Sequence, residues 1–123
     1  MEIEVTLRHI YRAAHKSIPA QAQRLSTQGN DIASAHGIAT QAATTGHPIS
    51  SDISTLAEEI VFRLGQVVTT MNTCALELDK VADDFAATDD QAAAWLREHQ
   101  SWIAQNGYGG EPAAAPVPTY PEA

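Results

Sequence analysis

The chain is poor in the residues that build disulfides, catalytic centres and large globular cores. It has one cysteine, Cys74, which excludes an intramolecular disulfide. Its 123 residues include only two Phe, three Tyr and two Trp, so bulky side chains for a core are few. The sequence therefore favours a thin, elongated bundle of helices in close contact over a compact globule.

Basic residues are also scarce. Seven Lys and Arg against fifteen Asp and Glu give a formal net charge of -8. A nucleic-acid partner needs a Lys- and Arg-rich face that releases counterions from phosphates, and basic binding to an anionic membrane surface needs a similar face. We therefore expect neither kind of binding.

Long apolar runs and a secretory signal are absent too. No stretch approaches the roughly 20 apolar residues that cross a bilayer. The acidic N-terminus lacks the basic and apolar regions of a cleavable signal peptide. We expect no stable membrane insertion, and a cytoplasmic protein unless some pathway exports it folded.

Arrangements that carry chemistry are missing as well. The sequence shows no Ser/His/Asp or Cys/His set, no glycine-rich phosphate loop and no paired carboxylates that stand out. The five histidines form neither an i, i+4 pair nor a Cys/His cluster, and the acidic run between Asp79 and Asp90 lacks the spacing of a calcium loop. The sequence predicts no enzyme, no cofactor and no metal site.

What the chain does have is a long apolar stripe between Ile53 and Phe85. Its members recur at spacings of three and four, which is typical of one face of an α-helix. They are Ile53, Leu56, Ile60, Leu64, Val67, Met71, Cys74, Leu78, Val81 and Phe85. We expect this stripe to pack on a partner helix, with the thiol of Cys74 buried and inert.

The first part of the chain carries a weaker stripe that begins after Thr6, a candidate N-cap. Its members are Leu7, Tyr11, Ala14, Ile18, Leu25, Ile32, Ala35 and Ala39, interrupted by Gln21 and Gln28. Pro19 predicts a kink near residues 17–20, because proline removes a backbone donor and clashes with the preceding turn.

The two stripes are separated by the only strong break in this part of the sequence, residues 44–52, which contains Gly46 and Pro48. A connection this short joins antiparallel neighbours. We predict an antiparallel two-helix hairpin with a helix at 6–44, a turn at 45–51, and a helix at 52–88 that begins near Ser51 or Asp52. Charge favours this pairing, because Arg8, Arg12 and Lys16 would lie level with an acidic row made of Asp79, Asp83, Asp84 and Asp89.

A third helical segment is predicted at 89–106. Thr88 to Gln91 fits a capping box, and Asn106-Gly107 is a typical helix stop. Since the hairpin is complete at Thr88, we expect this extension to have no arm of its own chain to pack on. Residues 1–106 would form the domain, and residues 107–123, rich in Pro and Ala, would be a disordered tail or a linker cut from a longer protein.

Two features suggest a protein partner. A second apolar stripe flanks the first on the 52–88 helix and consists of Val61, Phe62, Val68, Ala75, Leu76 and Ala82. Scattered exposed apolar residues are ordinary, but two helices cannot enclose a core, so a stripe of this size favours a helical partner. The predicted partner interface is Val61, Phe62, Val68, Leu76, Trp95 and Trp102.

The other feature is Phe85 followed at four positions by Asp89, at the end of the predicted hairpin. Phe85 is also the last residue of the apolar stripe, and an acid at position 89 suits the first turn of the next helix. By spacing alone the structural explanation is favoured over a functional one.

The arrangement of residues 5–96 resembles the small helical-hairpin substrates of actinobacterial type VII (ESX) secretion, in particular the EspC-like group. The resemblance rests on the turn Thr45-Gly46-His47-Pro48 and on residues 78–90, LDKVADDFAATDD. The Trp-x-Gly turn of the wider WXG family is absent. The family's export signal is Tyr-x-x-x-Asp/Glu, to which Phe85 and Asp89 correspond.

The resemblance implies that the protein is exported folded, as a dimer, by a membrane ATPase. That ATPase would read the turn of one chain, with Gly46, His47 and Pro48, together with Phe85 and Asp89 of the other. The partner would be the chain itself or a related hairpin in a four-helix arrangement. The protein would be cytoplasmic before export and secreted or on the cell surface afterwards.

Two alternatives stay open. The chain could be a cytoplasmic helical adaptor or chaperone that covers an apolar face of a toxin's N-terminal domain. It could also be the N-terminal targeting domain of a longer toxin.

Overall fold

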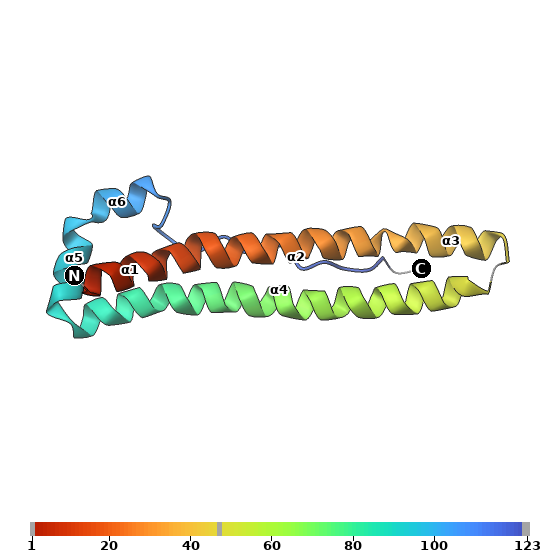
Figure 1. Ribbon diagram of the computed structural model, residues 1–123, viewed down its shortest axis with the longest axis horizontal. Coiled ribbons are helices and arrows are strands. Elements are labelled where there is room, and N and C mark those ends of the chain that lie inside the picture. The colour runs from red at the N-terminus through yellow and green to blue at the C-terminus, as the bar shows by residue number, and fades with distance from the viewer. Residues whose placement is uncertain (1, 47, 122–123) are drawn as a thin grey trace. The chain divides into compact units, whose positions relative to one another are not determined.

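A computed structural model describes residues 2–46 and 48–121, and within these residues the chain is helical without any β-strand (Figure 1). The helices are α1 (Glu2–Arg12), the π-helix η1 (Ala13–Ser17), α2 (Ile18–Ala33), α3 (Ala35–Thr44), α4 (Ile49–Thr88), α5 (Asp90–Glu98) and α6 (Gln100–Gln105). The predicted all-α class is confirmed. The chain divides into two compact units: unit one is residues 1–21 with 71–114, and unit two is residues 22–70 with 115–123.

The helix ends agree with the sequence at Thr44 and Thr88, α6 ends at Gln105, one residue before the predicted end at 106, and the starts differ. The first helix is already formed at Glu2, so Thr6 is not its N-cap, and α4 begins at Ile49 rather than beyond Ser51. Neither early start meets a helix breaker, since Pro48 lies just outside α4 and proline is tolerated at a helix N-terminus.

The π-helix η1 lies just before Pro19, near the position where the sequence predicts a kink. The backbone N–H of Ile18 donates to the carbonyl of Ala13, five residues earlier, and the wider turn ends just before Pro19. A π-turn contains one residue more than an α-turn, and such turns are rare and occur mostly as single-turn bulges inside α-helices. We attribute η1 to Pro19, which has no backbone N–H to donate and whose ring clashes with the preceding helical turn.

This extra residue shifts the buried face by one position between α1 and α2. Before η1 the predicted Leu7, Tyr11 and Ala14 are buried. After it, the stripe moves from positions 21, 25, 28 and 32 to Ala22, Ser26, Gly29 and Ala33. The polar Gln21 and Gln28, which interrupted the predicted stripe, are thereby exposed.

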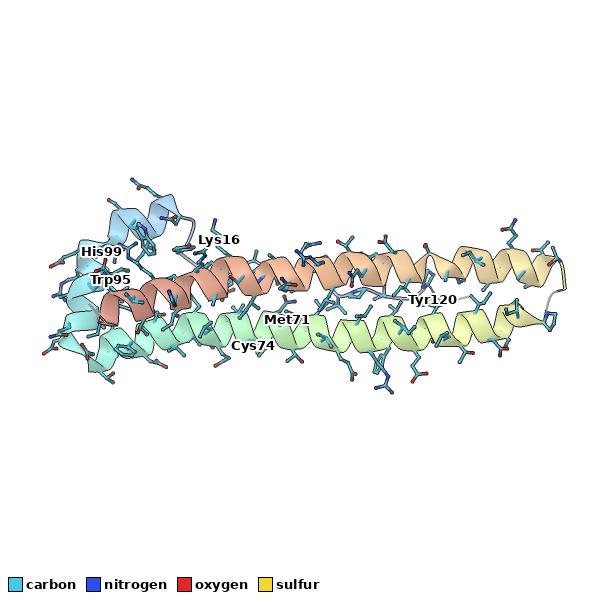
Figure 2. All side chains as sticks on the ribbon, in the orientation of Figure 1. Lys16, Met71, Cys74, Trp95, His99 and Tyr120 are labelled. Carbon is cyan, nitrogen blue, oxygen red and sulfur yellow. The ribbon has the colours of Figure 1, made fainter. Side chains whose placement is uncertain are left out.

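The buried face of α4 is likewise not the predicted one. Its buried members are Ala57, Val61, Val68, Ala75 and Ala82. Five members of the predicted stripe are exposed instead: Leu56, Ile60, Val67, Cys74 and Val81. Small side chains let helices approach closely, so a face rich in alanine packs at short range, whereas the larger side chains remain outside. Cys74 is therefore exposed, not buried as expected (Figure 2).

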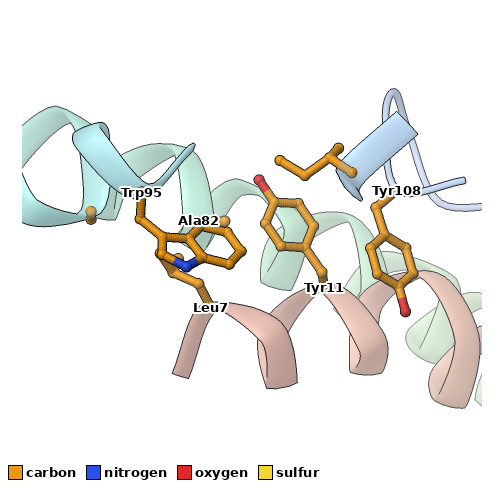
Figure 3. Packing of buried hydrophobic residues seen from close by; sticks show 7 residues of the cluster. Leu7, Tyr11, Ala82, Trp95 and Tyr108 are labelled. Atoms are coloured by element: carbon orange, nitrogen blue, oxygen red, sulfur yellow. The ribbon is translucent and has the colours of Figure 1, made fainter. Parts of the chain in front are cut away.

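In unit one, α5 and α6 fold back on α1, and this corrects the prediction that the third segment has no arm to pack on (Figure 1). The buried cluster consists of Leu7, Tyr11, Ala82, Ala92, Trp95, Ile103 and Tyr108 (Figure 3). The rings of Tyr11 and Tyr108 stack with centroids 5.8 Å apart and an interplanar angle of 11°. Aromatic burial of this kind supplies much of the area that the alanine-rich helices lack.

The bend from α4 into α5 is made by Asp89, whose backbone is extended with φ -133° and ψ 117°. Asp89 is thus the N-cap, one residue after the Thr88 that the capping box predicted. At the other end the predicted stop is confirmed, because Asn106 follows the last residue of α6 and Gly107 has φ +72°.

In unit two, residues 22–44 are joined to the first part of α4 through Thr45 and Gly46, with Gly46 at φ +72°. The predicted turn residue His47 lies outside the described residues.

The segment 115–121 of unit two was predicted to be disordered, and the structure instead packs it on the helices. The hydroxyl of the buried Ser26 donates to the carbonyl of Pro116 at 2.6 Å. A Cβ on Gly29 would lie 2.5 Å from Cγ of Pro118, and one on Gly65 would lie 3.1 Å from Cγ1 of Val117. The two glycines therefore form a slot for this segment, which lacks regular structure but is held by contacts.

Candidate functional site

Phe85 and Asp89, the predicted export signal, lie where α4 ends in unit one. The backbone N–H of Asp89 donates to the carbonyl of Phe85 at 2.9 Å, so the last helical turn still joins the two residues. Phe85 is half-buried and packs against the unit-one core, while Asp89 is half-buried at the corner. The pair is brought together, with the ring facing inward.

The carboxylate of Asp89 is engaged in capping. Its Oδ1 accepts hydrogen bonds from the backbone N–H groups of Gln91 at 2.9 Å and Ala92 at 3.0 Å. An aspartate at this position satisfies two of the free N–H groups in the first turn of α5 and also favours the helix dipole. The side chain that caps α5 is therefore the same side chain that the predicted export signal requires.

The predicted partner interface is divided by the structure. Val61, Val68 and Trp95 are buried within the chain itself, and Leu76 and Trp102 are half-buried. Only Phe62 is freely available, with 65% of its surface exposed. Val61 and Val68 are therefore covered within the chain itself and are not on its surface.

Other apolar residues of α4 take the exposed position instead. Ile60 and Val67 in unit two, and Cys74 and Val81 in unit one, are all exposed and follow one another at intervals of seven residues in the sequence. We call these four residues the heptad row. A seven-residue apolar repeat is the pattern with which a helix packs against another helix in a coiled coil.

Unit two also contains a hollow of about 980 Å³ between α4 and the segment 117–120. Phe62, Gly65 and Thr69 line its helical side. Tyr120 lies on the other side, where its hydroxyl donates to the Ser54 hydroxyl at 3.4 Å and its ring meets that of His36 edge-on (Figure 2). Sequence reasoning missed this hollow because it treated the tail as disordered.

A second missed feature lies in unit one. A hollow of about 550 Å³, which we call the basic pocket, is lined by Arg8, His9, Arg12, Lys16, Trp102, Asn106 and Tyr108. The i, i+4, i+8 spacing of Arg8, Arg12 and Lys16 could have indicated a basic face. Sequence reasoning assigned that face to pairing with the acidic row of α4.

A histidine of η1 contacts the acidic row of α4 in unit one. Nε2 of His15 lies 2.6 Å from Oδ1 of Asp79, and the His15 side chain is only 4% exposed. Beside this contact, burial raises the pKa of the Tyr11 phenol above its usual value, and the carboxylates of Asp83 and Asp79 raise it further. His15 thus contacts the acidic row in unit one, whereas Arg8, which was predicted to lie level with that row, pairs with Glu4 on its own helix.

Neither a metal-holding group nor a membrane-spanning helix is found among the described residues. No group of three or more His, Cys, Asp or Glu side chains among them could hold a metal ion. None of the helices in residues 2–46 and 48–121 combines the length and apolarity of a membrane span. Comparison with protein-family models, with curated proteins and with solved structures finds no match to this chain.

Proposed function

We propose that this chain is a type VII secretion-associated substrate or targeting partner that binds another helical hairpin and is exported folded. The observation that carries the proposal is the heptad row, a line of apolar side chains on α4 that the chain itself leaves exposed. Apolar residues with this spacing are stabilised when a second helix covers them.

The proposal includes a finer description of the fold. The fold is the antiparallel two-helix hairpin expected from the sequence, and two such hairpins associate as a four-helix arrangement along the heptad row. Phe85 and Asp89 then mark the end of the hairpin at which the export signal is read, together with Gly46, His47 and Pro48 of the partner's turn. The partner is a second copy or a related hairpin, and the reader is the secretion ATPase.

Export is tested with Asp89→Asn in a host with an active type VII system, by measuring the protein in culture filtrate and in cell lysate. Asparagine is as good an N-cap as aspartate, so the variant should fold and accumulate normally in lysate. Loss of the negative charge should lower its amount in filtrate at least tenfold. Asp31→Asn, an equal charge change at an exposed position of α2, is the matched control and should be exported like the wild type.

Equal amounts of Asp89→Asn and wild type in filtrate would contradict the export signal. A wild-type chain that stays in the lysate of the same host, bound to the product of a neighbouring gene, would instead favour the adaptor alternative.

A further inference from the structure

The basic pocket of unit one is a concentration of positive charge in an acidic protein. Three of the seven Lys and Arg residues line it together with His9, and none of its described lining residues is a carboxylate, although acids outnumber bases fifteen to seven. It is therefore a local exception to the charge of the chain, and its volume of about 550 Å³ is within the ordinary range for ligand sites.

Two of its cations lack a counter-charge. Arg8 donates from Nε and Nη2 to Oε1 of Glu4 at 3.2 and 3.1 Å. Arg12 and Lys16 are exposed and form no ion pair with any other residue of the described part. Both cations line the same pocket, so an anion bound between them would relieve their mutual repulsion.

The pocket is held in shape by aromatic rings. Cζ of Arg8 lies 4.5 Å from the ring centroid of Trp102, and Nζ of Lys16 lies 5.9 Å from that of Tyr108. Tyr108 is itself buried and stacked on Tyr11 (Figure 3). Cation–π contacts restrain the two cationic side chains, and restrained side chains lose less entropy when a ligand binds.

The same contacts define what the pocket can recognise. Arg8 covers a face of Trp102, and Tyr108 is stacked on Tyr11, so these rings are already engaged and the site offers mainly charge. Arg12 ends α1 and Lys16 lies in η1, and both line the pocket. An extended peptide carries carboxylates on one side at every second residue, about 6.6 Å apart, so one acidic segment can pair with both cations at once.

From this geometry we propose that the basic pocket binds an acidic peptide segment of a partner protein, with successive carboxylates meeting Arg12 and Lys16. The proposal does not depend on secretion or on the heptad row, since it concerns a different surface.

The proposal is tested by titrating the full chain with hexaglutamate. Binding is measured by calorimetry and also by tryptophan fluorescence, because Trp102 lines the pocket. The double variant Arg12→Gln, Lys16→Gln should weaken binding at least tenfold. The double variant Arg24→Gln, Arg97→Gln removes the same charge at exposed positions outside the pocket and should change the affinity less than twofold. Circular dichroism checks that all variants remain folded, and Lys16→Gln alone, expected to weaken binding at least threefold, replaces a double variant that does not fold.

Three outcomes would overturn the proposal. The first is that hexaglutamate does not bind at low ionic strength. The second is that the control variant loses as much affinity as the pocket variant, which would mean that net charge alone attracts the peptide. The third is that inorganic phosphate competes with hexaglutamate at equal concentration, which would make the pocket a site for small anions.

Discussion

At the scale of single residues, Asp89 shows how a side chain with a proposed recognition role is also used by the fold. Its Oδ1 accepts both capping bonds, from Gln91 and Ala92, and the extended backbone of Asp89 turns the chain from α4 into α5. The effect of removing the capping group must therefore be measured separately from the effect of removing only the charge.

Asp89→Ala is expected to lower the free energy of unfolding by about 1 kcal/mol, because the first turn of α5 loses its side-chain acceptor. Asp89→Asn should stay within about 0.5 kcal/mol of the wild type, since an amide oxygen can accept the same bonds. Urea unfolding followed by circular dichroism measures both values. An alanine variant as stable as the asparagine variant would mean that the cap contributes nothing.

Tyr11 is the residue for which the structure predicts a pH dependence. Its pKa is raised by burial and then by Asp83 and Asp79, so the folded state holds the phenol proton more tightly than the unfolded state does. The stability associated with Tyr11 is therefore complete below the unfolded pKa of about 10 and is lost as the pH rises through the folded value.

Tyr11→Phe should remove this part of the alkaline loss of stability, as measured by thermal unfolding between neutral pH and the tyrosine range. The difference in tyrosinate absorbance between wild type and variant should show a transition above the usual tyrosine pKa. A difference titration at or below that value would contradict the burial of the phenol.

At the scale of elements, the slot for residues 115–121 depends on two positions without a side chain. Gly29 of α2 and Gly65 of α4 leave space for Pro118 and Val117, respectively. Glycine inside a helix costs about 1 kcal/mol relative to alanine, so a gain from close packing has to offset it.

Gly29→Ala should release the segment 115–121 while leaving the helices intact, because the new Cβ would lie 2.5 Å from a ring atom of Pro118. Hydrogen exchange of residues 115–121, or their cleavage by a protease, should become faster. Gly37→Ala in α3 is the control, since nothing lies within 4 Å of its added Cβ. If residues 115–121 exchange hydrogen, or are cleaved, at the same rate in both variants, the slot does not hold this segment.

At the scale of the whole molecule, substitutions at the neighbouring residues Val67 and Val68 test association and folding separately. Val67 is 45% exposed and belongs to the heptad row, whereas Val68 is fully buried at 0%. A charge introduced at one position meets solvent or a partner, and at the other it meets the interior of the chain.

Val68→Asp should lower the stability by several kcal/mol, enough to unfold a chain of this size, since an unpaired charge would be buried. Val67→Asp should remain folded by circular dichroism and should abolish the self-association, or the binding to a related hairpin, that light scattering detects for the wild type. A wild-type chain that is monomeric at tens of micromolar and binds no neighbouring-gene product would contradict the use of the heptad row.

Local features of the sequence determined where helices exist and where several of them end. Spacings of three and four predicted the long helix up to Thr88, and Gly46 and Asn106-Gly107 marked stops that the structure confirms. Such features depend on backbone conformation within a few residues, and the amino-acid types nearby are sufficient to specify it. The presence of Phe85 and Asp89 at the end of that helix was predictable for the same reason.

Tertiary structure decided which face of each helix is buried. Hydrophobicity alone could not choose Val68 over Val67, because the choice depends on how closely a neighbouring backbone can approach small side chains such as Ala22, Ser26 and Gly29. The return of α5 and α6 onto α1, the basic pocket that this return creates and the packing of residues 115–121 have the same cause. Each requires complementary space between segments that are far apart in the chain, and no local spacing records that space.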